Sequence, residues 1–107
     1  MKKEGATEGF PFDHNTLVFK VRGKMFALTD VEAFEGVNLK VDPEHGAELR
    51  DRYAFVQPAY HMNKRHWITV VMDGTVPDKL IKGLIDDSYK LVVSGFTKSH
   101  KLALKGK

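Results

Sequence analysis

The residues of this chain that are best equipped for chemistry lie between Pro58 and Val71. Two rings with a polar edge, two imidazoles and two positive charges occur there, in Tyr60, Trp67, His61, His66, Lys64 and Arg65. Lysine and arginine neutralise phosphates, while rings and imidazoles stack on bases or hydrogen-bond to phosphate oxygens. The composition therefore predicts a surface for a polyanion. The plainer alternative is a solvated hairpin whose charges only protect a strand from aggregation.

A second group of cations, Lys20, Arg22 and Lys24, surrounds a predicted turn. Together with the cations near Asn63, these residues would form two basic hairpin tips that neutralise several phosphates. We therefore predict a nucleic-acid-binding set on two hairpins. Its members are Lys20, Arg22, Lys24, Tyr60, His61, Asn63, Lys64, Arg65 and His66.

Patterns for catalysis and for metal binding are weak in this sequence. The five histidines lack the spacing of one helical face and no cysteine supports them, so we expect no metal site and no cofactor. Ser88 falls within a helical pattern, without a Gly-x-Ser-x-Gly elbow, and the glycines form no phosphate-cradling loop. Acid–base catalysis by His61 with Asp73 can be imagined, but nothing fixes their geometry. We expect a binding protein and not an enzyme.

The length and composition indicate one soluble domain. A chain of 107 residues, of which 42% are hydrophobic, is long enough to form a single core. No segment approaches the roughly 20 apolar residues that a membrane span requires, and Met1–Glu4 leads into no secretory signal. The absence of cysteine fits a cytoplasmic location. We expect a cytoplasmic protein without a membrane partner.

Charge is unevenly distributed along the chain. Residues 97–107 contain four lysines and no acid, so the net charge of +3 arises from this tail. Residues 30–51 contain seven acids against two bases, Lys40 and Arg50. A dipolar protein can turn its positive side toward a polyanion, although a basic terminus is most often a solvated end.

The strands that must position the basic tips follow from alternating patterns. Residues 16–21 and 24–29 alternate around Arg22-Gly23, which predicts a hairpin with a two-residue turn. Residues 37–42 predict a third strand with one wet face. The Pro58–Val71 stretch predicts a strand, a basic turn and a strand, with the turn at Asn63-Lys64-Arg65 because the asparagine amide can bond its own main chain.

Two helices are predicted beside these strands. The first begins at Asp42-Pro43-Glu44, where aspartate caps the open N–H groups and proline is preset for the first turn, and it runs to residue 52 or 53. Its few apolar positions are Ala47, Leu49 and Tyr53. The second covers residues 77–96 and shows helical spacing of apolar residues. Those expected to face the sheet are Leu80, Leu84, Ile85, Leu91 and Val92.

These elements predict an α+β fold in one domain, 1–107. Its core would be an antiparallel sheet of about five strands covered by helices, in two layers. Residues 1–9 show no apolar periodicity and are expected to be a loop. We expect both ends, 1–9 and 97–107, to be flexible.

The block Tyr60–Trp67, Tyr-His-Met-Asn-Lys-Arg-His-Trp, is specific enough to compare with known families. With Phe10-Pro11-Phe12, Asn38–Pro43 and the segment from Leu80 to Val93, it resembles the YjbR/MmcQ family of small bacterial proteins. The resemblance covers residues 10–96. It implies a two-layer fold like that of the frataxin-related CyaY proteins, and a double-wing role in binding double-stranded DNA.

Members of that family usually begin with a helix ahead of the Phe10-Pro11-Phe12 block. Only nine residues precede the block here, so we expect that the helix is absent or that this chain starts late. A missing helix would leave part of the sheet uncovered, which favours self-association into a homodimer.

The leading hypothesis is therefore a bacterial, non-catalytic DNA-binding module with two basic wings. The alternative is a protein- or small-ligand-binding module that uses the aromatic face near Tyr60 and Trp67. An enzyme comes third, and iron handling by analogy with the frataxin-like fold comes fourth, because fold analogy alone is a weak argument for function. Salt dependence separates the first two, since phosphate binding weakens steeply with salt and apolar binding does not.

Overall fold

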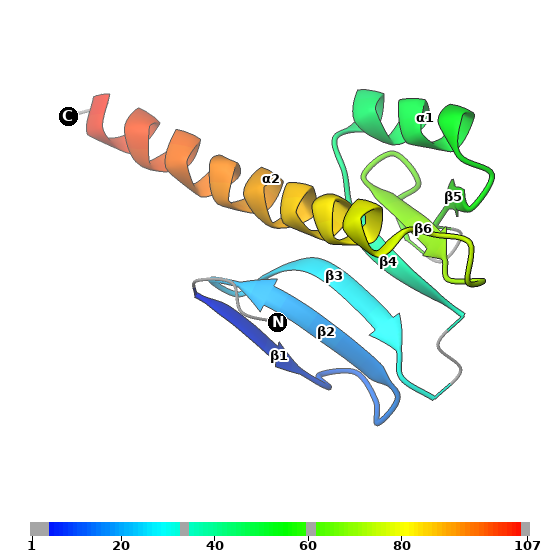
Figure 1. The fold of residues 1–107 in the computed structure, drawn as a ribbon. Helices are drawn as coiled ribbons and strands as arrows, with labels where there is room; N and C mark the ends of the chain where they lie inside the picture. The colour runs from blue at the N-terminus through cyan, green and yellow to red at the C-terminus, as the bar shows by residue number, and fades with distance from the viewer. Residues whose placement is uncertain (1–4, 33–34, 60–61, 106–107) are drawn as a thin grey trace.

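The computed structural model describes residues 5–32, 35–59 and 62–105, with side chains described up to Gly95. Within these residues, one antiparallel sheet has the strand order β1-β2-β3-β4-β6-β5 (Figure 1). Its strands are β1 (Ala6–Gly9), β2 (Thr16–Val21), β3 (Lys24–Asp30), β4 (Gly36–Lys40), β5 (Val56–Pro58) and β6 (Trp67–Val71). The helices are α1 (Pro43–Arg52) and α2 (Asp78–Lys105). The predicted α+β class with an antiparallel sheet is confirmed.

The turn between β2 and β3 has the predicted length. Val21 pairs with Lys24, which leaves Arg22-Gly23 as the connection. Both turn residues have positive φ, 51° at Arg22 and 80° at Gly23, as the central residues of a type I′ hairpin turn do. Glycine adopts this backbone without a steric cost, whereas the Cβ of Arg22 is crowded there.

Helix α1 begins as its sequence predicts. Asp42 is the N-cap, and its Oδ2 accepts a hydrogen bond from the backbone N of His45 at 3.3 Å. Of the predicted apolar positions, Leu49 is buried and Tyr53 packs against the core, whereas Ala47 is exposed and Gly46 is buried in its place. Helix α1 therefore approaches the sheet along its glycine.

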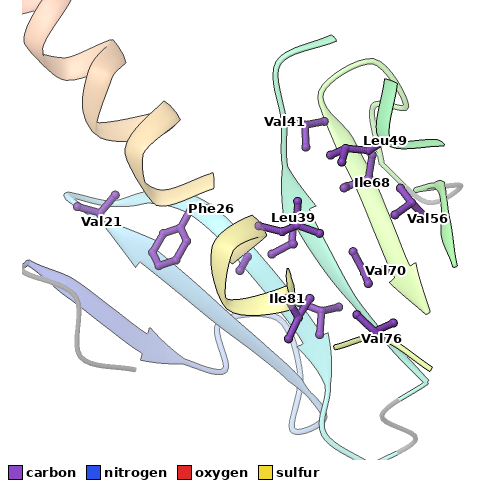
Figure 2. Packing of buried hydrophobic residues seen from close by; sticks show 13 residues of the cluster. Val21, Phe26, Leu39, Val41, Leu49, Val56, Ile68, Val70, Val76 and Ile81 are labelled. Carbon is purple, nitrogen blue, oxygen red and sulfur yellow. The ribbon is translucent and has the colours of Figure 1, made fainter. Parts of the chain in front are cut away.

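Helix α2 covers one face of the sheet (Figure 1). Leu39 and Ile68 are fully buried in the cluster drawn in Figure 2, and Ile81 and Leu84 of α2 pack into the same cluster. Leu80, Ile85 and Val92 are partly buried against it. The predicted stripe is thus confirmed at four of its positions, whereas Leu91 lines hollows beside the cluster.

Three segments differ from the sequence prediction. The strand expected to begin at Pro58 is β5, which begins at Val56 and ends at Pro58. Residues 6–9, predicted to be a loop, form β1, in which Ala6 pairs with Val21 of β2. A strand that hydrogen-bonds to a neighbour through its backbone needs no apolar alternation of its own. Helix α2 continues past residue 96 to Lys105, because one glycine at residue 95 costs only about 1 kcal/mol in a helix. In the described part of the chain, neither helix has the apolar stretch of a membrane span.

Candidate nucleic-acid interface

Antiparallel pairing brings the two predicted basic tips to the same end of the sheet. The β2–β3 turn leaves the sheet where Val21 pairs with Lys24. Strand β4 finishes at this end, where Lys40 pairs with Trp67, the first residue of β6. Strand β5 also finishes here, at Pro58. We call this the basic end of the sheet.

The two tips lie on different parts of the strand order. The first tip lies between β2 and β3, and the second lies between β6 and β5, with β4 in the middle of the order. Three inter-strand spacings of about 4.8 Å, together with the twist of the sheet, separate the two tips. Both tips therefore lie at the same end of one sheet.

The first tip presents its cations on a short hairpin. Arg22 and Lys24 are exposed, and Lys20 is half-buried opposite Met25. A β-bulge beside Lys20 shifts the pairing register between β2 and β3. Bulges increase strand twist and change the direction of side chains.

The second tip is held by its asparagine, as predicted. The Oδ1 of Asn63 accepts a hydrogen bond from the backbone N of Arg65 at 3.0 Å, and its carbonyl accepts one from the backbone N of His66 at 3.1 Å. The carbonyl of His66 in turn accepts from the backbone N of Val41 at 2.8 Å. These bonds join the loop to the residue after β4, while the side chains of Lys64 and Arg65 remain exposed.

Helix α1 also contacts this loop. The Nη1 of Arg50 lies 3.5 Å from the carbonyl oxygen of Lys64 and donates a long hydrogen bond to it. Arg50 was not in the predicted set, and nothing in its helical position reveals that it reaches the loop. Two members of the set, Tyr60 and His61, lie outside the described residues.

Trp67 and Lys40 form a pair at the centre of the basic end. Trp67 is 6% exposed, so it is packed and does not offer an open ring for stacking. The Nζ of Lys40 lies 5.3 Å from the centroid of the indole ring, within the range of a cation–π contact. Lys40 lies among acids in the sequence and was not in the predicted set, because only strand pairing joins it to Trp67 and strand pairing cannot be read from local patterns.

Acidic residues gather at the opposite end of the sheet. The β1–β2, β3–β4 and β6–α2 connections leave there, and they carry Asp13, Asp30, Glu32, Glu35 and Asp73. Hydrogen bonds from the backbone N–H groups of Asn15 and Thr16 lower the pKa of Asp13. The hydroxyl and N–H of Thr75 lower the pKa of Asp73. These connections therefore place acids at the end of the sheet away from the two tips, whereas Asp42 and Asp87 line a hollow together with Lys40.

These carboxylates are spread over the acidic end and do not converge. Within the described residues, no three histidine or carboxylate side chains lie close enough together to hold a metal ion.

The chain matches a known protein family along most of its length. The family model YjbR matches residues 1–91. The protein YjbR of Escherichia coli K12 is 39% identical over 95 residues, which cover 88% of this chain and 80% of that protein. The protein YbdF of Escherichia coli O157:H7 is 39% identical over 90 residues, which cover 83% and 74%.

Solved structures agree with this relationship. A crystal structure of a Deinococcus radiodurans protein has a TM-score of 0.80 at 47% identity, and the match covers 94% of this chain and 78% of that one. A crystal structure of a Pseudomonas syringae protein has a TM-score of 0.69 at 35% identity, covering 84% and 89%. These relatives share the fold, and their names state no activity. On the evidence of sequence and structure together, the chain belongs to the YjbR family.

Proposed function

We propose that the protein binds double-stranded DNA through the basic end of its sheet, without catalysing a reaction. The observation that supports this proposal most is the meeting of two separately formed basic tips at one end. Arg22 and Lys24 come from one hairpin, while Lys64 and Arg65 come from another. Contacts between cations and phosphates supply most of the affinity of non-specific DNA binding.

The placement of both tips at one end of the sheet suits a duplex. The major groove is about 12 Å wide, and two separate tips can lie on its two sides. Each tip would contact the phosphates on one side of a groove, and the buried Trp67 between them would not enter the base stack. Binding of this kind positions a protein on the backbone and reads little sequence.

The distribution of charge would also orient the protein on DNA. The acids of the β1–β2, β3–β4 and β6–α2 connections lie at the far end, so repulsion from phosphates turns that end away from DNA. With few phosphate contacts, we expect a Kd of about 10⁻⁴–10⁻⁶ M at physiological salt and little preference for sequence.

The salt dependence of binding tests this proposal. A fluorescently labelled duplex is titrated with protein at several salt concentrations, and log K is plotted against log salt. Replacing Lys64 and Arg65 by alanine should reduce the slope by about 2, equally for unrelated sequences. The matched control replaces Lys79 and Lys82, two exposed lysines at the start of α2, by alanine and should leave the slope unchanged. Equal slopes for the two double variants would contradict the proposal.

A further inference from the structure

A hollow of ≈ 680 Å³ opens between the basic end of the sheet and α2. Its size lies within the range of about 300–1,000 Å³ that is usual for small-molecule sites. Apolar side chains from four separate segments supply its walls, among them Phe12, Met25, Trp67, Leu91 and Val92. Phe12 is 66% exposed although it is a large apolar residue, so this wall is still open to a partner.

Three cations, Lys20, Lys24 and Lys40, line the same hollow. Among the described residues that line it, none is a carboxylate, so these residues do not balance its positive charge. A cavity with low-dielectric walls and charge of one sign concentrates ligands of the opposite sign. The hollow is therefore suited to an anion.

In the pair of Lys40 and Trp67, a cation of the hollow lies next to one of its apolar side chains. The Lys40 ammonium lies 5.3 Å from the indole centroid, and an aromatic ligand beside Trp67 would lie within reach of this cation. Although Trp67 is packed and its face is not open, a ligand ring can still meet its edge, and edge contacts between rings add to the free energy of burying apolar area. A flat ring with an acidic group would use both features at once.

We propose that this hollow binds a small organic anion in which a carboxylate is attached to a flat aromatic body. An inorganic anion would leave the apolar walls wet, and a neutral aromatic would leave the three lysines without a partner. The site goes beyond DNA binding and does not depend on it, because the cations of the second tip, Lys64 and Arg65, do not line the hollow. Lys20 and Lys24 belong to both surfaces.

Trp67 provides a direct readout because the chain has a single tryptophan. Its indole N–H gives one side-chain signal in a ¹H–¹⁵N spectrum, which is followed while 2-naphthoate is added. We expect a saturable shift of that signal. The neutral match, 2-naphthamide, should bind about tenfold more weakly, the factor expected for one lost charged contact, and acetate should cause no saturable shift.

Two substitutions test the role of the lysines. Lys24→Gln removes a cation that does not touch the indole, and Lys40→Gln removes the one that does. Each should weaken 2-naphthoate about tenfold without changing the affinity for 2-naphthamide, whereas Lys82→Gln on the exposed face of α2 should change neither. Three results would overturn the proposal. The first is the absence of a saturable shift of the Trp67 signal at millimolar 2-naphthoate. The others are equal affinities for 2-naphthoate and 2-naphthamide, or equal affinities of all three variants for 2-naphthoate. The variant with Lys64 and Arg65 replaced should keep its affinity, so failure of DNA binding and failure of this site are distinguishable.

Discussion

The hydroxyl of Ser88 lies 2.7 Å from the carbonyl oxygen of Lys40, and the resulting hydrogen bond joins the middle of α2 to the last residue of β4. Ser88 is 1% exposed. Its hydroxyl also lies 3.1 Å from the carbonyl of Leu84, but one proton cannot serve both acceptors equally, and the shorter contact is with Lys40. The bond therefore holds α2 against the strand that carries a central cation of the basic end.

Replacing Ser88 by alanine should destabilise the fold. The carbonyl of Lys40 would lose its partner in a partly buried position, which costs about 1–3 kcal/mol. Ser94 is an exposed serine on the same helix, and Ser94→Ala should change the free energy of unfolding by less than about 0.5 kcal/mol. Denaturant unfolding measures both variants, and equal effects would show that the Ser88 bond contributes nothing.

Two helical glycines should respond in opposite directions to the same substitution. A Cβ added at Gly46 would lie 2.9 Å from the Cγ2 of Val41, whereas one at Gly83 would meet nothing within 4 Å. Gly83→Ala should stabilise the protein by about 0.5–1 kcal/mol through helix propensity. At Gly46 an overpacking cost of about 1–3 kcal/mol exceeds that gain. Thermal unfolding checks the sign, and stabilisation by Gly46→Ala would mean that α1 can move away from the sheet.

Arg22→Asn should separate stability from DNA binding. The φ of 51° at Arg22 is crowded for arginine and tolerated by asparagine, and Asn-Gly is the preferred pair in this kind of turn. We expect a stabilisation of up to about 1 kcal/mol, since a left-handed residue costs about 1–2 kcal/mol. The slope of log K against log salt should fall by about 1, because one cation is lost. A more stable protein with an unchanged slope would exclude Arg22 from the interface.

The Asp13 turn should lose its contribution to stability in acid. Hydrogen bonds from the N–H groups of Asn15 at 2.8 Å and Thr16 at 2.6 Å favour the carboxylate and lower its pKa. The contribution is present above the unfolded pKa of the aspartate and is lost as pH falls through the lower folded pKa. It is small, since the carboxyl group is exposed. A carboxyl ¹³C titration should give a midpoint below that of an unfolded aspartate, and an ordinary midpoint would mean that the turn is open in solution.

Deletion of residues 97–107 tests whether the wings or the tail bind DNA. The deletion removes four lysines without changing either hairpin, so binding should weaken but persist, and its remainder should still depend on Lys64 and Arg65. The measurement is the same duplex titration at varied salt. If the deletion abolishes binding while substitution of Lys64 and Arg65 changes nothing, the lysine tail binds DNA and the wing proposal is wrong.

The parts of the fold that could be predicted have local causes. Arg22-Gly23 between two alternating runs specifies a hairpin, and Asp42-Pro43 specifies a helix start; the structure confirms both. The Asn63 turn also depends on bonds within four residues. Each of these features depends on residues that are neighbours in the sequence, so the sequence pattern alone predicts it.

The parts that were missed depend on contacts between distant segments. Strand β1 exists because it pairs with β2, and its residues show no strand pattern of their own. Gly46 is buried in place of Ala47 because Val41 approaches α1 at that point. The position of β4 between β3 and β6 brings Lys40 to Trp67. The order of the strands in the sheet decides which charged residues become neighbours, and this order cannot be predicted from local sequence patterns.

The lateral strands of the sheet have a further consequence for association. Strand β1 has four residues, and β5 has three and ends in Pro58, which has no backbone N–H to donate. Growth of a sheet from one molecule to the next requires a long row of unpaired backbone groups. Within the described residues, neither lateral strand of this sheet offers such a row. The two short lateral strands therefore give a second copy little backbone to extend, which disfavours growth into fibrils.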